Sequence, residues 1–291
     1  MRSKVISWLL VFIMTSALTG CSTTAEKNGV EVNTVKPVKV LVSILPQADF
    51  VGSIGGEKVE VTVLIPPGAN PEDYEMSPRQ IQKISEADMY ITVGNIPFEE
   101  INMERIKSAN PDMSIISFNE KHDENTEAHK HDPHVWLSPR LVMEQAEIIC
   151  KELSLIDSAN ETFYLKNKNA YISELERLDI EIKELLADRQ RDHFLVYHPA
   201  WGYFAEDYGL VEIAVEKDGK EPTAGEMARI IEEAESRGIK EVLVSPQHST
   251  RSAETIAKQM GGEIKVVDPL PGNYIEGMRE AAYTFKEVLN D

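Results

Sequence analysis

Histidine and carboxylate side chains occur at four places where the chain is expected to turn. His198 and Asp268 each end an apolar, β-branched stretch and each precede a proline. His134 lies in a short run between two prolines, and the fourth place is the acidic segment 71–75. Imidazole nitrogen and carboxylate oxygen are ligands for zinc and related transition-metal ions. These residue types therefore suggest a metal site with mixed nitrogen and oxygen ligands.

The positions of these residues favour the ligand interpretation. His198 and Asp268 are expected at the carboxyl ends of buried strands, where α/β folds form their binding crevices. His198 could instead be a core histidine, but the matching position of Asp268 favours a shared site. Trp136 and Leu137 are expected to anchor their segment in the core, which leaves His134 free to point into the crevice.

The first twenty residues have the composition of a secretory signal peptide. A basic start precedes the apolar segment 5–14, which is shorter than the roughly 20 apolar residues of a membrane span. The following Leu18-Thr19-Gly20-Cys21 resembles a prokaryotic lipobox, so Cys21 is expected to carry a lipid. The alternative is plain secretion with a chance cysteine. Residues 21–37 lack periodicity and are expected to form a flexible tether.

Composition argues against several classes of function. Removal of residues 1–20 takes away two basic residues and no acidic ones, so the net charge of −19 becomes −21. Nucleic-acid binding needs clusters of Lys and Arg, and so does a basic membrane-binding face. An acidic surface suits a cation receptor, although it also serves solubility. Cys150 lies in an apolar periodic stretch and is expected to be a buried thiol. The only other cysteine is Cys21, which is expected to carry the lipid, so the sequence offers no disulfide framework.

Strand-like and helix-like segments alternate in both halves of the chain, which predicts α/β lobes with parallel sheets covered by helices. Serine–proline pairs and a Thr–Glu capping box mark three of the helix starts. The expected strands are 38–42, 59–65, 89–93, 113–116, 193–197, 241–244 and 264–267. The marked helices begin at Ser77-Pro78, Ser138-Pro139 and Thr223, and a further helix is expected from about Arg251.

A long helical segment separates the two halves. Residues 160–189 contain neither glycine nor proline and have apolar residues at helical spacing. About 30 residues at a rise of 1.5 Å give a rod of roughly 45 Å. We therefore expect an N-terminal lobe at 38–157, one rigid linking helix at 158–190 and a C-terminal lobe at 191–291. Both lobes can then contribute ligands to a cleft between them.

One stretch, 119–131, is charged, aperiodic and rich in histidine. Such a composition predicts a mobile loop. Weak capture of cations by its histidines and a merely solvated loop are both compatible with the sequence.

Four segments of the chain, 64–75, 132–139, 198–204 and 266–270, contain the candidate ligands and their flanking prolines. Together they resemble the zinc- and manganese-type receptors of ABC transporters, the TroA-like class. The resemblance extends over essentially the whole mature chain, including the lipobox and the histidine-containing loop. It implies two α/β lobes, a rigid linking helix, a metal ion held between the lobes, and delivery of that ion to a membrane permease driven by a separate ATPase.

The resemblance implies Glu72, His134, His198 and Asp268 as the metal ligands. Most members of the class have a histidine where this chain has Glu72. A carboxylate there can bind zinc, or Glu75 or water can take its place; a third possibility is His248, the remaining strand-end histidine.

The expected function is the capture of Zn²⁺, with Mn²⁺ as the second candidate, by a receptor that is not an enzyme. This receptor is expected to be a monomer outside the cytoplasm, anchored to the membrane through its lipid. A metal-dependent hydrolase is the rival class, but the sequence has no His-Glu-x-x-His helix, nucleophile elbow or Gly-rich phosphate loop. A receptor for a chelated metal or a corrinoid is a third possibility, which Trp201 and Tyr203 would favour if they lined a wide cleft.

Overall fold

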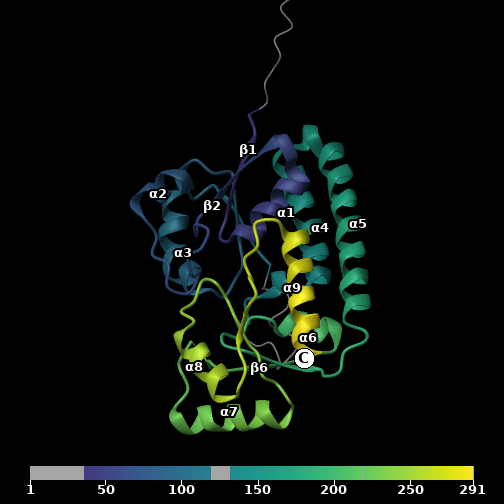
Figure 1. Cartoon of the computed structure of the whole chain (residues 1–291). Coiled ribbons are helices and arrows are strands. Elements are labelled where there is room, and N and C mark those ends of the chain that lie inside the picture. The colour runs from purple at the N-terminus through teal and green to yellow at the C-terminus, as the bar shows by residue number, and fades with distance from the viewer. Residues whose placement is uncertain (1–35, 119–131, 218, 291) are drawn as a thin grey trace, which may run out of the picture. The chain divides into compact units, whose positions relative to one another are not determined.

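The computed structural model describes residues 36–118, 132–217 and 219–290. Two parallel four-stranded sheets form two lobes within these residues, which confirms the predicted fold class (Figure 1). The expected signal peptide, the lipid at Cys21, the tether up to residue 35 and the loop 119–131 lie outside the described residues.

The N-terminal sheet has the strand order β2-β1-β3-β4. Its central strands are almost entirely buried, because β-branched and aromatic side chains fill both faces of β1 and β3. Helices α1 and α4 cover one side and α2 and α3 the other (Figure 1). The elements are β1 (Val38–Val42), α1 (Leu45–Gly55), β2 (Val59–Val63), α2 (Pro78–Ser85), β3 (Met89–Thr92), α3 (Pro97–Ala109), β4 (Ser114–Ser117) and α4 (Pro139–Ile156).

The C-terminal sheet has the order β6-β5-β7-β8 and repeats this plan. A small apolar cluster fills the space between the sheet and the helices α7 and α8. The edge strand β6 was not predicted, because its four residues include Glu212 and an exposed Val211. The elements are β5 (His193–Val196), α6 (Gly202–Tyr208), β6 (Val211–Ala214), α7 (Ala224–Ser236), β7 (Val242–Val244), α8 (Arg251–Gln259) and β8 (Ile264–Val266).

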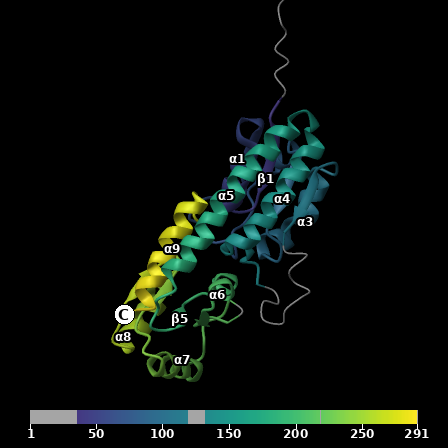
Figure 2. The ribbon, with the colours of Figure 1, turned by 90° about the vertical axis from the view of Figure 1, so that its right-hand side faces the viewer.

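Two helices, rather than one, run along both lobes. The expected linking helix is α5 (Glu161–Leu185), whose 25 residues span about 37 Å. The C-terminal helix α9 (Tyr274–Val288) packs beside it (Figure 2). Tyr274 of α9 meets Phe50 of the N-terminal lobe with ring centroids 5.0 Å apart, and Phe285 packs on the C-terminal lobe. One continuous apolar core therefore joins the two lobes along these helices.

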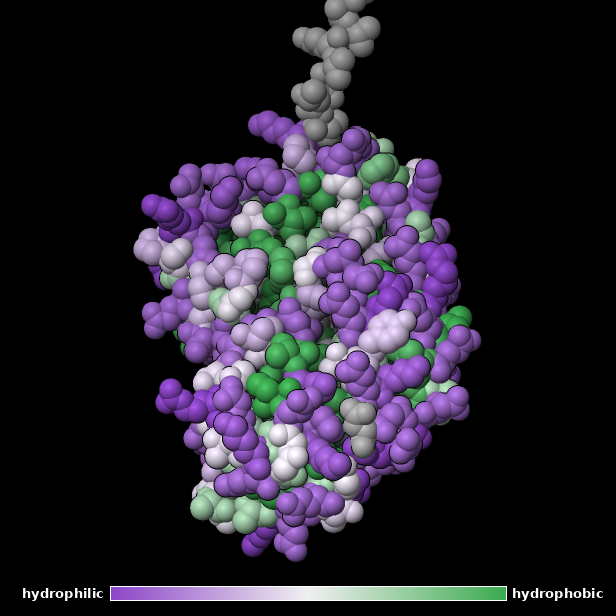
Figure 3. All heavy atoms as spheres, viewed as in Figure 1, coloured by the Kyte–Doolittle hydropathy of each residue, from purple (hydrophilic) through white to green (hydrophobic). Residues whose placement is uncertain are grey.

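Hydrophilic residues cover most of the face shown in Figure 3, and hydrophobic residues appear in separate areas near its centre. Among the described residues, none of the helices combines the length and the apolar composition of a membrane span.

Candidate metal centre

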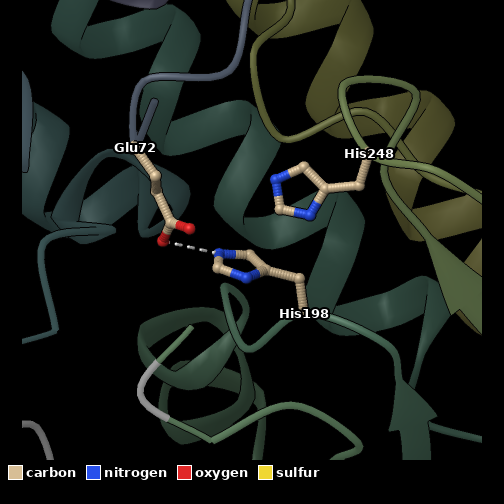
Figure 4. Close-up of side chains that lie close together, drawn as sticks. All are labelled: Glu72, His198 and His248. Carbon is tan, nitrogen blue, oxygen red and sulfur yellow. Dashed lines mark ion pairs between the residues drawn. The ribbon is translucent and has the colours of Figure 1, made fainter. Parts of the chain in front are cut away.

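Three side chains meet between the two lobes. One nitrogen of His198, one nitrogen of His248 and one carboxylate oxygen of Glu72 all lie within 4.8 Å of one another. Figure 4 shows the three side chains pointing toward a shared space from three different loops. Glu72 comes from the loop between β2 and α2 of the N-terminal lobe, whereas the histidines follow β5 and β7 of the C-terminal lobe. A ligand bound here contacts both lobes.

Glu72 lies in a loop whose conformation is fixed by local hydrogen bonds. The Oδ1 atom of Asn70 accepts a hydrogen bond from the Glu72 amide at 3.0 Å, which closes a turn of the Asx type. Gly68 has a φ of +82°, a conformation that side-chain-bearing residues rarely adopt. The Glu72 side chain remains 39% exposed, so its carboxylate keeps contact with solvent at the mouth of the site.

His198 is held in one orientation by a carboxylate. Its Nδ1 atom lies 3.0 Å from Oε2 of Glu216, and its Nε2 atom lies 3.4 Å from Oε1 of Glu72. With zinc bonds of about 2.0–2.1 Å, two ligand atoms of a tetrahedral ion are about 3.3 Å apart. The separation between Glu72 and His198 therefore suits two ligands of one ion, and Glu216 fixes which nitrogen faces that ion.

The half-buried Glu212 fixes the turn that follows His198. Its Oε1 atom accepts hydrogen bonds from the amides of Ala200 and Trp201 at 3.1 and 3.0 Å. Burial raises the pKa of Glu212 to about 7, and the two amides offset part of that rise. Carboxylates therefore support both the ring of His198 and the turn that follows it.

His134 lines the same pocket but does not belong to the three-residue cluster. Its Nδ1 atom lies 2.7 Å from Oδ1 of Asp132, which leaves Nε2 as the free nitrogen. Its ring centroid is 5.6 Å from that of His198 and 5.1 Å from that of Trp136. Trp136 is buried, as expected, and its Nε1 donates to the carbonyl of Pro269 at 2.7 Å, so it ties this wall to the C-terminal lobe.

His248 has the environment of a neutral imidazole. Burial lowers its pKa, and the neighbouring His198, whose ring centroid is 4.5 Å away, lowers it further. Nearby Glu216, Glu72 and Asp73 oppose this change without reversing it. The neutral ring is the form that binds metal ions, so His248 is well suited to ligate at neutral pH.

A pocket of about 510 Å³ contains these groups and draws its walls from both lobes. A second, more polar cavity of about 650 Å³ shares Glu72 and His248 with it and is also lined by Asp73, Glu216 and Glu221. These acids place negative charge beside the cluster, which favours the approach of a cation.

The other candidate residues lie elsewhere. Asp268 is exposed and outside the three-residue cluster, and its carboxylate accepts a hydrogen bond from Gln247. Glu75 is exposed and absent from the pocket lining. Trp201 and Tyr203 are buried and do not line the pocket, so the aromatic lining expected of a corrinoid receptor is not formed by them.

Three supporting carboxylates, Asp132, Glu212 and Glu216, were not identified from the sequence. Asp132 stands two residues before His134, a spacing that allows a local contact. Glu216 follows β6, the neighbour of β5, so it lies beside His198 for the same reason that strand ends meet at one edge of a sheet. Prediction of β6 would have pointed to Glu216.

Comparison with known proteins gives consistent results. The family model described as zinc-uptake complex component A, periplasmic (ZnuA), matches residues 40–288. The high-affinity zinc uptake system protein ZnuA of Bacillus subtilis is 27% identical, over 97% of this chain and 98% of that protein. The zinc-binding lipoprotein AdcA of Streptococcus pneumoniae is 28% identical over 99% of this chain, but the match covers 61% of its own length.

Solved structures show the same similarity. A crystal structure of a ZnuA protein has a TM-score of 0.82 and 36% identity, over 88% of this chain and all of that one. The metal-dependent lipoprotein YcdH of Bacillus subtilis has a TM-score of 0.73 and 26% identity, over 87% of this chain and 99% of that one.

Proposed function

The chain belongs to the family of the zinc-uptake complex component A, and from this premise we propose that it is an extracytoplasmic receptor that binds Zn²⁺ and delivers it to the permease of an ABC transporter. The observation that carries the proposal is the meeting of Glu72, His198 and His248 between the lobes, within 4.8 Å of one another. Zinc is the cargo of this receptor and not a catalytic group. The chain therefore needs no general base and carries out no turnover.

Four residues bind the ion in this proposal. Glu72, His198 and His248 supply three ligands, and His134 on the same pocket wall supplies the fourth. The carboxylate of Asp132 holds the Nδ1 of His134, so that its Nε2 is presented to the ion.

The donor set favours zinc as the cargo. Three imidazoles and one carboxylate are typical of zinc, whereas manganese prefers sites with more oxygen ligands. Mn²⁺ is the second candidate. An additional carboxylate ligand from Asp268 would favour the binding of Mn²⁺.

The N-terminus supports the location of the receptor. A lipid on Cys21, followed by the polar tether, would hold a monomeric receptor near the permease while the two lobes remain free to collect the ion.

Calorimetric titration of the mature chain with Zn²⁺, in the presence of a competing chelator, tests the proposal. His198→Ala should lower the zinc affinity by at least a hundredfold. His193→Ala is a matched control, because His193 begins the same strand and pairs with Asp192 away from the pocket. Equal affinities of the two variants would refute the proposed site, and a native chain that binds no Zn²⁺ would refute the proposed function.

A further inference from the structure

A hydrogen bond between a serine and an aspartate joins the two segments that carry His134 and His198. His134 is followed by the buried residues 135–137 and then by Ser138, which begins α4 of the N-terminal lobe. His198 is followed by a turn and by α6 of the C-terminal lobe, which contains Asp207. The hydroxyl of Ser138 donates to Oδ2 of Asp207 at 2.5 Å, so this bond links the two lobes directly.

The chain between each histidine and this link is held by further hydrogen bonds. Residues 134–138 form one closed turn, in which the Leu137 amide donates to the His134 carbonyl at 3.1 Å. Glu212 holds the turn that follows His198, and α6 comes directly after it. A movement of either lobe at the link is therefore passed on to its imidazole. The link thereby helps to set the distance of 5.6 Å between the centroids of the two rings.

Both partners of the link depend on it for their bonding. Besides its bond to Asp207, the hydroxyl of Ser138 accepts a hydrogen bond from the Leu141 amide at 3.1 Å and so caps α4. The Asp207 side chain is only 15% exposed. Burial raises the pKa of Asp207, and the bond from Ser138 and the charge of Arg140 offset part of that rise. A carboxylate that is this far from solvent needs such partners, which favours the arrangement of the lobes that supplies them.

Arg140 extends the link to the long helix α5. Its Nη1 atom lies 3.3 Å from Oδ1 of Asp207, and its Nε atom lies 3.3 Å from Oδ1 of Asp179 on α5. The Arg140 side chain is 41% exposed, and exposed ion pairs contribute little to stability. The hydrogen bond between Ser138 and Asp207 is therefore the main connection at this point.

We propose that Asp207 is a positioning residue for the metal site: through Ser138, it holds the lobes at the spacing at which His134 and His198 bind the same ion. This inference rests on the proposed function. Without the link, part of the metal-free population has the two imidazoles too far apart to bind one ion. The apparent affinity then falls in proportion to the fraction of chains that can bind.

Substitutions of Asp207 separate positioning from the effect of negative charge. Asp207→Asn keeps an oxygen that accepts the bond from Ser138 and loses only the charge, so it should bind Zn²⁺ within about threefold of the native affinity. Asp207→Ala removes the acceptor and should weaken binding by about tenfold, as expected on losing a group that orients a ligand. Ser138→Ala should lose similar affinity, and the double alanine variant little more, because both changes break one connection.

Thr223→Ala is a matched control for Ser138→Ala. Thr223 also caps a helix, α7, but its hydrogen bonds are with Glu226 of that same helix, and it does not line the metal pocket. The two variants should lose similar stability through the loss of a cap, whereas only Ser138→Ala should lose affinity for Zn²⁺.

The experiment is a chelator-competition titration of the mature proteins with Zn²⁺, together with thermal unfolding of the metal-free proteins. Thermal unfolding shows whether each variant is folded and how much stability it has lost. If Asp207→Ala does not fold, the comparison of Ser138→Ala with Thr223→Ala tests the inference.

Several results would overturn the inference. Native affinity in folded Asp207→Ala or Ser138→Ala would give the link no role in binding. Equal losses in Asp207→Asn and Asp207→Ala would assign the effect to charge, and equal losses in Ser138→Ala and Thr223→Ala would assign it to general destabilisation. A native chain that binds no Zn²⁺ would refute the proposed function and this inference with it, and that result is distinct because it is observed without any variant.

Discussion

Glu99 is a buried carboxylate whose replacement should change how the stability of the protein depends on pH. The residue lies in the first turn of α3 and is 3% exposed. Its oxygens accept hydrogen bonds from the amides of Val93 and Gly94, both at 2.7 Å, and from the hydroxyl of Ser43. Burial raises the pKa of Glu99 to about 7, although these hydrogen bonds offset part of the rise. Glu99 thereby holds the loop that leads into the pocket at Asn95 and Ile96.

The sign of the effect follows from the difference between the folded and unfolded chains. The ordinary pKa of a glutamate is 4.5, so the folded chain binds the proton more tightly than the unfolded chain. The resulting stabilisation is fully present below pH 4.5 and is lost as the pH rises through about 7. At 1.36 kcal/mol for each pH unit, the loss amounts to about 3 kcal/mol in the free energy of unfolding.

Glu99→Gln removes this titration. Glutamine gives up part of the hydrogen bonding, at a cost of about 1–3 kcal/mol that is the same at every pH. The free energy of unfolding of Glu99→Gln, relative to that of the native chain, should therefore rise by about 3 kcal/mol between pH 4.5 and pH 8. Urea unfolding followed by circular dichroism, in the presence of a chelator, measures this difference.

Glu104, on the same helix, provides a matched control. Its side chain is exposed, so Glu104→Gln should follow the pH dependence of the native chain. A Glu99→Gln variant whose stability runs parallel to that of the native chain across this pH range would refute the reasoning about burial.

Two further substitutions have definite expected outcomes. Glu216→Ala removes the partner of the His198 Nδ1 atom and should lower zinc affinity by about 10–100-fold in a chelator-competition titration; an unchanged affinity would show that the ring is oriented by other contacts. Phe285→Ala removes a ring that packs against Phe194, Trp201 and Phe204, so the free energy of unfolding should fall by about 3–5 kcal/mol in urea; a loss below about 1 kcal/mol would contradict the central place of α9 in the core.

Local sequence signals predicted much of the fold. The Thr223–Glu226 capping box begins α7 as expected, and the hydroxyl of Ser138 accepts a hydrogen bond from the Leu141 amide at the start of α4. These helix caps depend only on residues that are close in the sequence, so they can be predicted from the sequence alone. The course of α9 depends instead on the distant contacts of Tyr274 and Phe285, which leave no local pattern.

The candidate site, like the fold, was predicted only in part from the sequence. His134 and His198 were expected in one cleft, and both line the same pocket, because a strand end and an anchored tryptophan determine their places. His248 was one of several alternatives to Glu72, whereas the structure places these two residues together. The position of Asp268 depends on its hydrogen bond to Gln247 in another loop, which no spacing in the sequence indicates. The ligand set itself stays a prediction.

A crystal structure of the zinc-loaded protein, with anomalous diffraction recorded at the zinc absorption edge, tests the central claim most directly. The predicted result is one strong anomalous peak between the lobes, within about 2.0–2.2 Å of nitrogens of His198 and His248 and of a carboxylate oxygen of Glu72. A peak bound elsewhere on the chain, or zinc-loaded protein with no peak in this pocket, would contradict it.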